Sequence, residues 1–391
     1  MTSGARYPRP RACSGRLFVI LWREGRVVGI RREWGGAVEL DVEVCTPGTG
    51  SGGAWSACRA LAYPALVGRP EPNDLVLLNT TALERGLGTG GYAFVVAVPQ
   101  RPPVDPPIGP GHLVKARYTP LQAMVLGVDD PESPDHETLA EADDLFGMPV
   151  VTADLHSAVP AIVAGIRESR PDARIVYVLT DGGALPAWFS MTVASLRDAG
   201  WISACVSTGQ AFGGDHEAVT VHTGLLTARL VRHADVAVVA QGPGNLGTDT
   251  RWGFSGVSVG EAINAAGVLH GRPVAALRVS QADPRPRHRG VSHHTLTAVG
   301  RVAQVPADVA VPLLPGAFGD GIREAASRLG PPTGRHRLVE VGVDGLLEAL
   351  KDCPVPLRTM GRGLDDDPAS FLAAAAAGRH AASLLGAPAR G

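Results

Sequence analysis

The segment MPVVTADLHSAVPAIVAGIRESRPDARIVYVLTD, residues 148–181, places two short apolar runs on either side of a longer stretch with helical spacing of apolar residues. This order is typical of a βαβ unit, in which two parallel strands are buried on both faces of a sheet. The same alternation continues along the chain. Further strand candidates are QAMVLGV (122–128), WISACVS (201–207), DVAVVAQ (235–241), RPVAALRVS (272–280), and the weaker VAVPLLP (309–315) and HRLVEVGV (336–343).

Helix candidates lie between these runs: AVPAIVAGIRESR (158–170), LPAWFSMTVASLRDAG (185–200), HEAVTVHTGLLTARLVRH (216–233) and VGEAINAAGVLHG (259–271). We therefore predict an α/β fold with a doubly wound, mostly parallel sheet. A generous count gives eight βα units, so a closed eight-stranded βα barrel is the alternative. The irregular spacing and the two weak final strands favour the open sheet.

The first hundred residues show a different pattern of apolar residues. Five short runs rich in Val, Ile and Leu are separated by Gly or Pro clusters, which predicts a small β-domain, a barrel, over residues 1–100. These runs are RLFVILW (16–22), VVGI (27–30), AVELDVEV (37–44), DLVLLN (74–79) and YAFVVAV (92–98). We predict a proline-rich linker over 101–118, the α/β domain over 119–360, and an Ala-rich C-terminal helix over 361–391.

The composition excludes several classes of protein. With 45% hydrophobic and 19% charged residues and a net charge of -2, the chain is an ordinary globular protein, and nothing in the charge balance favours nucleic acid or an acidic membrane as partner. The five cysteines are odd in number and form no C-x-x-C pair, which is typical of reduced thiols in the cytoplasm. The run FVILW is too short for a signal peptide, and no apolar run approaches the roughly 18 residues of a membrane helix. We expect a cytoplasmic protein, with a homo-oligomer as one option.

In either architecture ligands bind at the carboxyl ends of the parallel strands. Five successive strand candidates end in loops rich in glycine or ionisable residues, namely DLH (154–156), TDGGALP (180–186), GGDHE (213–217), GPGNLG (242–247) and QADPRPRHRGVSHHT (281–295). A small anionic ligand would suit these loops. The predicted ligand-binding residues are Gly182, Gly183, Gly242, Gly244, Asn245, Arg251, Arg287 and Arg289.

Two of these loops have simpler interpretations. Asp215 in GGDHE fits the N-cap of a helix better than a catalytic group. GPGNLG matches the dinucleotide pattern G-x-G-x-x-G, but the next helix is expected to begin only near Ser258, where SVGE resembles a capping box. That distance argues against a nicotinamide cofactor.

The strongest signal is RHRGVSHHT, residues 287–295. Ser292 is a candidate N-cap, which would place His293 and His294 in the first turn of a helix, where the helix dipole disfavours their protonation. Neutral imidazoles bind metals or act as bases, while arginines bind anions. We therefore predict Asp154, His156 and His288 as ligands of a possible divalent metal, and as catalytic residues Asp181, Asp215, His216, His293 and His294.

The stretches GPGNLGTDTRWGFSG, LRVSQADPRPRHRGVSHHTLTA and TGQAFGGDHEAV resemble a bacterial domain-of-unknown-function family with an RHRGVSHHTLTA-like segment. The likeness extends from the N-terminal β-rich part to about Val311. The family has no assigned reaction, cofactor or catalytic residue, so the resemblance implies no function.

Three functional hypotheses remain. The first is an enzyme that acts on a small anionic metabolite, such as a phosphoester or nucleotide, with possible help from a metal. The second is a metabolite sensor or scaffold without catalysis. The third is a nucleic-acid-associated protein that uses Arg23, Arg26, Arg31, Arg32 and Trp34, although a solvated arginine-rich hairpin explains these residues better.

Overall fold

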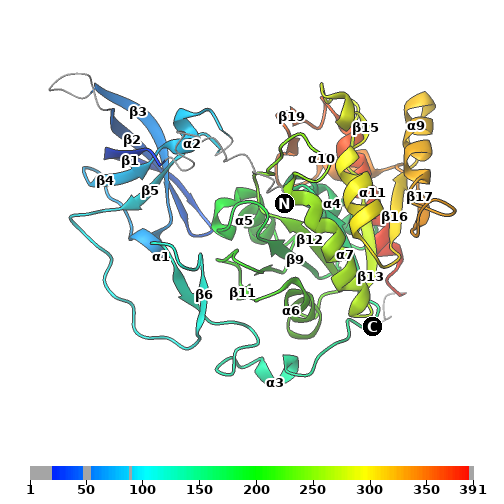
Figure 1. Ribbon diagram of the computed structural model, residues 1–391, viewed down its shortest axis with the longest axis horizontal. Coiled ribbons are helices and arrows are strands. Elements are labelled where there is room, and N and C mark those ends of the chain that lie inside the picture. Colours follow the sequence, from blue (N-terminus) through cyan, green and yellow to red (C-terminus); the bar gives the residue numbers. More distant parts are fainter. Residues whose placement is uncertain (1–19, 47–53, 88–89, 387–391) are drawn as a thin grey trace, which may run out of the picture. The chain divides into compact units, whose positions relative to one another are not determined.

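The computed structural model describes residues 20–46, 54–87 and 90–386 (Figure 1). They form two compact units. One contains the described residues up to Val104 except Trp34–Ala37, and the other contains Trp34–Ala37 together with the described residues from Asp105 onward. No helix in the described ranges is long and apolar enough to span a membrane.

The first unit contains a closed five-stranded barrel in the order β1-β2-β3-β5-β4. Its interior is filled by aliphatic side chains such as Val27, Leu40, Val42 and Leu78. The run predicted at 16–22 lies mostly outside the described residues, and sequence analysis did not predict β3. The elements are β1 (Trp22–Trp34), β2 (Ala37–Thr46), β3 (Ala54–Ala62), β4 (Leu75–Asn79), β5 (Ala93–Ala97), and the short helices α1 (Pro64–Val67) and α2 (Thr81–Glu84).

The second unit contains a parallel sheet of eight strands in the order β11-β10-β9-β12-β8-β13-β16-β17. The sheet is open, with β11 and β17 at its edges, so the closed βα barrel does not form. The mixed α/β class is confirmed. The strands are β8 (Pro149–Ala153), β9 (Ile175–Thr180), β10 (Ala204–Ser207), β11 (His216–Glu217), β12 (Val236–Gln241), β13 (Arg272–Ala276), β16 (Asp308–Pro312) and β17 (Arg337–Val341).

Both faces of the central strands are buried, as the continuous apolar runs indicated. Along β12, Val236 and Val238 belong to a core shared with helices α4 and α11, whereas Ala237 and Val239 belong to a core shared with α6 and α7. The helices of this unit are α3 (His136–Leu139), α4 (Val159–Ser169), α5 (Met191–Asp198), α6 (Val221–Leu226), α7 (Val259–Val268), α8 (His293–Thr297), α9 (Gly316–Ser327), α10 (Leu346–Lys351) and α11 (Pro368–Ser383).

Three two-stranded ladders complete this unit. They are β6 (Leu113–Lys115) with β7 (Ala123–Val125), β14 (Val279–Ser280) with β15 (Gly290–Val291), and β18 (Arg358–Thr359) with β19 (Arg362–Gly363). The run at 122–128 was predicted as a strand of the main sheet, and this is wrong because β7 pairs with β6 instead. The buried ammonium group of Lys115 donates to the carbonyl oxygens of Ala211 and Ala218 (2.9 Å each), which attaches this hairpin beside β11.

The predicted helix start at residues 215–217 is also wrong. His216 and Glu217 form the edge strand β11, whose backbone pairs with Val206 and Ser207 of β10, and helix α6 begins only at Val221. The Glu217 carboxylate accepts from the Gly213 amide (2.6 Å) and the Ser207 hydroxyl (2.8 Å). Pairing with β10 therefore takes the place of the helical hydrogen bonds that were predicted for this segment.

The predicted C-terminal helix is α11, and it crosses α4 at two glycines. A Cβ on Gly165 would lie 2.0 Å from the carbonyl oxygen of Ala375, and a Cβ on Gly378 would lie 2.0 Å from that of Ile162. The two helix backbones are therefore in direct contact, and the tail forms part of the core beneath β8, β13 and β16.

We predict that Gly378→Ala lowers the free energy of unfolding by about 1–3 kcal/mol, because the added methyl group forces two backbones apart. The matched control is Gly321→Ala in α9, where a Cβ meets nothing within 4 Å. This control should raise the free energy of unfolding by about 0.5–1 kcal/mol, the usual helix-propensity gain. Equilibrium unfolding in urea measures both, and equal effects of the two substitutions would contradict the close crossing.

Candidate functional site

The candidate site lies at the carboxyl ends of β8 and β13, near the middle of the sheet. In the sheet, β9, β10 and β11 lie on one side of β8, and β13, β16 and β17 lie on its other side. Neighbouring strands whose connections leave in opposite directions create a crevice at their carboxyl ends, where open α/β sheets bind ligands. Asp154 follows β8, and Arg278 lies two residues beyond β13.

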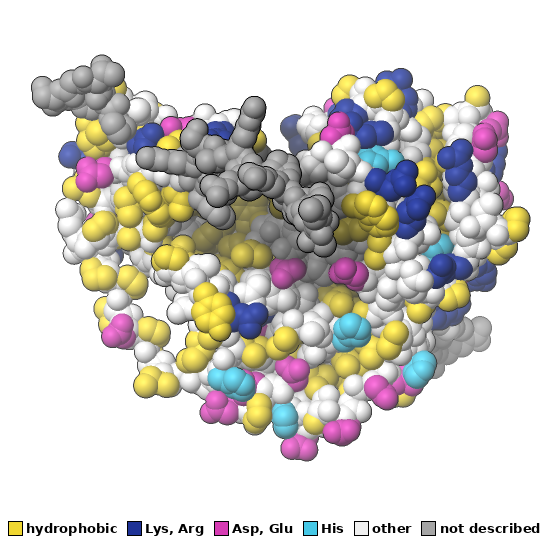
Figure 2. Space-filling view, viewed as in Figure 1, with side chains coloured by type: hydrophobic (Ala, Val, Ile, Leu, Met, Phe, Trp, Pro, Cys, Tyr) yellow, Lys and Arg dark blue, Asp and Glu magenta, His cyan; other side chains and the backbone are white. Residues whose placement is uncertain are grey.

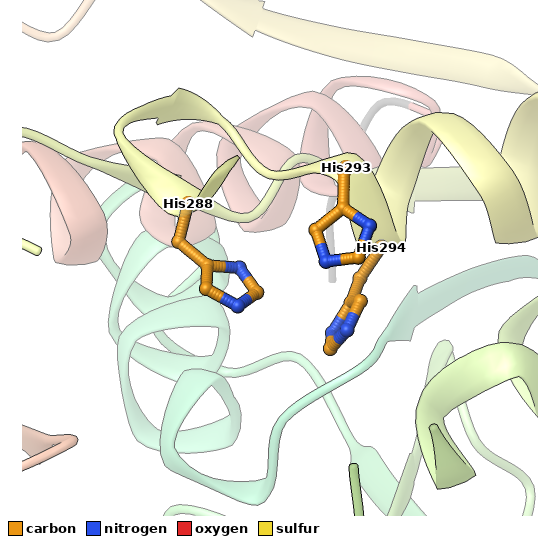
Figure 3. A group of neighbouring side chains, drawn as sticks. All are labelled: His288, His293 and His294. Carbon is orange, nitrogen blue, oxygen red and sulfur yellow. The ribbon is translucent and has the colours of Figure 1, made fainter. Parts of the chain in front are cut away.

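Three histidines meet above these strand ends. His288 lies in the loop between β14 and β15, and His293 and His294 are the first two residues of α8. One ring nitrogen from each of the three lies within 4.8 Å of the other two. Figure 3 shows the rings facing a common space, one from the loop and two from the start of the helix.

Ser292 sets the positions of these rings. Its hydroxyl oxygen accepts from the backbone N–H of His294 (3.2 Å), which confirms Ser292 as the N-cap of α8. The same oxygen lies 2.8 Å from Nδ1 of His288. If His288 donates from Nδ1 to this oxygen, its Nε2 is left as the lone-pair nitrogen, the state in which an imidazole binds a metal.

The three imidazoles are held neutral. Burial, followed by the charge of Arg278, lowers the pKa of His288 to about 4 and that of His294 to about 3. Burial and the charge of Arg287 lower the pKa of His293 as well. Sequence analysis predicted neutral imidazoles from the helix dipole, whereas burial and nearby arginines are the main causes in the structure.

Two residues that sequence analysis did not assign to the site contact His294. The ring of Phe254 stacks on the His294 ring with 3.8 Å between centroids and an interplanar angle of 2°. The buried Arg278 guanidinium donates to Nδ1 of His294 (3.2 Å) and to a carboxylate oxygen of Asp154 (3.3 Å). Arg278 immediately follows a strand candidate, so its position was a usable signal.

A buried ionic network supports the histidine loop. Asp283 accepts from the Nε and Nη2 atoms of Arg285 (2.9 Å each), and this interaction keeps the pKa of Asp283 well below its usual range. Asp367, just before α11, accepts from the Ser280 hydroxyl and from Nε of Arg362 (3.1 Å). The C-terminal segment thereby fixes the strand from which the loop leaves.

The remaining predicted residues are distributed over several loops. A Cβ on Gly183 would lie 2.1 Å from the carbonyl oxygen of Gly242, and a Cβ on Gly242 would lie 2.4 Å from that of Ala184. Gly182 is similarly close to Gln241, at 2.6 Å from its Oε1 atom. These glycines allow two strand-end loops to pack backbone against backbone, a role that does not require a ligand.

Asn245 and Gly244 lie in the second of these loops. The side-chain oxygen of Asn245 accepts from Nε2 of Gln241 (2.9 Å) and from the Ser255 hydroxyl (2.8 Å). Gly244 has a φ of 95°, and nothing lies within 4 Å of a Cβ built on it, so its backbone faces open space.

The predicted acidic residues differ in their surroundings. Asp154 lies 4.0 Å from Nδ1 of His294 and pairs with Arg278. Asp181 accepts from the backbone N–H of Gln210 (2.9 Å), and Asp215 pairs with Arg197. Asp154 therefore lies beside the histidine cluster, whereas the other two carboxylates are bonded to Gln210 and Arg197.

The two other predicted histidines have partners of their own. His156 forms hydrogen bonds to the Tyr177 and Ser190 hydroxyls (3.1 and 2.8 Å), so both of its ring nitrogens are engaged. His216 belongs to β11, and burial, followed by the charge of Arg232, lowers its pKa. The metal-ligating role predicted for His156 therefore receives no support from its contacts.

The three arginines that were predicted to bind a ligand are solvent-exposed. Arg287 forms an ion pair with Asp249, while Arg251 and Arg289 are exposed. Figure 2 shows basic side chains gathered over the part of the second unit that carries β15 and β19. Several barrel arginines also pair with acidic residues, as in Arg23–Glu84 and Arg31–Asp41, so they do not form a bare basic surface.

We predict that the free energy of unfolding decreases as the pH falls from about 6.5 toward about 4. Burial lowers the pKa of His156 to about 4 in the folded protein, and the unfolded chain takes up that proton near its ordinary value of about 6.5. His156→Gln should reduce this pH dependence by up to about 1.4 kcal/mol per pH unit. Urea unfolding between pH 4 and 7 tests this, and an unchanged slope in the variant would show that His156 does not contribute.

The comparisons with known proteins identify a family and no close relative. No curated protein and no solved structure matches the chain. A family model described as a protein of unknown function, DUF3866, matches residues 59–378. This range includes the barrel strands β4 and β5, the whole eight-stranded sheet and the three histidines, and it extends past Val311, where the expected resemblance ended. The chain belongs to the DUF3866 family of proteins of unknown function.

Proposed function

We propose that this protein is an enzyme that acts on a small anionic metabolite, such as a phosphoester or nucleotide, with a divalent transition metal held by His288, His293 and His294. The observation that carries the proposal is the grouping of three ring nitrogens within 4.8 Å. A second observation points the same way. Nε2 of His293 is buried without a hydrogen-bond partner among the described residues, which a ligand would satisfy.

The donor set favours a particular kind of metal. Three imidazoles with no carboxylate in the group suit zinc, copper, nickel or iron better than magnesium or calcium. Three protein ligands leave a coordination position for water or substrate, and a metal bound in this way would activate a water molecule for hydrolysis. The lowered pKa values of the histidines keep them ready to bind at neutral pH.

The hydrogen bond from Arg278 limits how His294 can bind a metal. A metal would bind either Nδ1 of His294 directly or Nε2 while Nδ1 carries the hydrogen. Either arrangement breaks the 3.2 Å hydrogen bond from Arg278 to Nδ1. Asp154 remains as the partner of Arg278, so we assign Asp154 the role of holding this guanidinium beside the metal rather than of ligating it.

The arginines supply the anion-binding part of the proposal. Arg287 lies close enough to His293 to lower its pKa, and it is anchored by Asp249. Arg251 is exposed in the loop after β12, and Arg289 is exposed next to His288. Guanidinium groups bind phosphate oxygens through paired hydrogen bonds, so an anionic substrate would be held with its reacting group at the metal.

We predict that the protein, purified without a histidine tag and equilibrated with Zn²⁺, retains about one equivalent of zinc after dialysis. His293→Ala removes the ligand with the unpartnered nitrogen and should weaken binding at least about tenfold. Elemental analysis and a competing chromophoric chelator measure both quantities. The control is His222→Ala, which changes an exposed histidine of α6 and should leave zinc binding unchanged.

If the wild-type protein retains none of Zn²⁺, Mn²⁺, Fe²⁺ or Cu²⁺, the metal part of the proposal is wrong. The anion site would then have to be judged by the following test alone.

We predict that inorganic phosphate or a nucleoside monophosphate raises the melting temperature, because a ligand that binds only the folded state stabilises it. Arg287→Ala should remove most of this increase. Arg272→Ala is the control, since Arg272 begins β13 and so lies at the opposite edge of the sheet. Equal increases in the wild type and in Arg287→Ala would contradict the assignment of Arg287. Binding without turnover of any phosphoester would favour the sensor hypothesis.

A further inference from the structure

His156, which the metal proposal does not use, forms a second cluster with Ser190 and Tyr177. The Ser190 hydroxyl oxygen lies 2.8 Å from Nε2 of His156, and the Tyr177 hydroxyl oxygen lies 3.1 Å from Nδ1. All three residues are buried. They come from separate elements, because His156 follows β8, Tyr177 lies within β9, and Ser190 is the N-cap of α5.

The hydrogen bonds of Tyr177 determine which nitrogen of His156 carries the hydrogen. The Tyr177 hydroxyl shares its one hydrogen between the carbonyl oxygens of Ala240 and Gln241 (3.1 Å each), so its oxygen is free to accept from His156. Nδ1 of His156 therefore donates to Tyr177, and Nε2 carries the lone pair. The Ser190 hydroxyl has to donate its hydrogen to that lone pair, which is the arrangement of a nucleophile and its general base.

Further contacts keep this pair in its reactive state. The Val193 amide donates to the Ser190 oxygen (3.0 Å), which stabilises negative charge on that oxygen. Burial lowers the pKa of His156 to about 4, so the imidazole is unprotonated at neutral pH and is a weaker base than an exposed histidine.

Ser190 also lies in the wall of a surface hollow. Ala187, Trp188 and Val193 contribute apolar walls to the hollow, and the Arg197–Asp215 ion pair contributes polar groups. Asp198 also lines the hollow, so its charged groups are one guanidinium and two carboxylates, and an anionic group is disfavoured there. The apolar part of the wall is where a short uncharged acyl chain would pack.

We propose that Ser190 is a nucleophile activated by His156, and that the hollow accepts the acyl group of an ester of a small apolar acid. Ser190 Oγ attacks the ester carbonyl carbon while its proton moves to Nε2 of His156. The bond to the alcohol breaks, and the departing alcohol takes that proton. Water then attacks the acyl-serine and gives a proton to Nε2, and Ser190 Oγ leaves and takes this proton back. The net reaction consumes one ester and one water and yields one acid and one alcohol.

Tyr177 replaces the carboxylate that usually orients such a histidine. Its hydroxyl fixes the ring orientation but adds no negative charge to stabilise an imidazolium. We therefore expect reaction with activated esters, such as p-nitrophenyl butyrate, and with fluorophosphonates.

The test is labelling of the full chain with a fluorophosphonate probe, located by peptide mass spectrometry. We expect one phosphonyl group on Ser190, and we expect the reaction to stop when the protein is denatured in guanidinium. Ser190→Asn keeps an N-cap acceptor for α5 and should abolish labelling. His156→Gln should slow it by at least about a hundredfold. Ser195→Ala, on the same helix, should label like the wild type.

Absence of label on Ser190 in the folded wild type overturns the proposal and requires no variant. Labelling that persists at the same rate in folded His156→Gln also overturns it, because Ser190 would then react without its base. The reaction uses no metal, so a chelator should leave the labelling rate unchanged. This independence separates the outcome from that of the zinc experiment.

Discussion

The burial of both faces of the central strands is the constraint on which the rest of the second unit depends. Side chains of β8, β9 and β12 alternate between two apolar cores, so no polar group can lie along these strands without a partner. Most polar groups therefore lie at the strand ends, and the hydroxyl of Tyr177 within β9 is bonded to carbonyl oxygens at the end of β12. At the carboxyl edge, the chain leaves β8 toward one side of the sheet and leaves β13 toward the other. Asp154, Arg278 and the three histidines lie in the segments that follow these two strands.

The loop after β8 serves two different clusters. Asp154 contacts Arg278 and so faces the histidines of the β15–α8 segment, whereas His156, two residues later, contacts Tyr177 and Ser190 on the β9–α5 side. The two clusters have different chemistry. One groups neutral imidazoles beside arginines, which suits a metal and an anion, and the other joins one imidazole to hydroxyl groups, which suits proton transfer to and from an oxygen.

The C-terminal helix links stability to the site. Helix α11 packs on α4 through the contacts at Gly165 and Gly378, and Asp367, one residue before it, receives hydrogen bonds from Ser280 and Arg362. Ser280 also accepts from the backbone N–H of Asp283, which in turn binds Arg285. The base of the histidine loop is thus hydrogen-bonded to the residue that precedes α11.

Local patterns in the sequence determined the α/β class, most of the strands, the N-terminal barrel, the docked tail helix and the N-cap at Ser292. Each of these depends on the apolar spacing or turn chemistry of a short segment. The pairing of 122–128 with β6, the edge strand β11, and the contacts of Arg278, Phe254 and Ser190 were decided by tertiary structure alone. Ser190 and His156 lie 34 positions apart, and Arg278 and Asp154 lie 124 apart. Such residues meet because of the order in which the strands pair, and strand order depends on packing across the whole sheet, which the periodicity of a single segment does not encode.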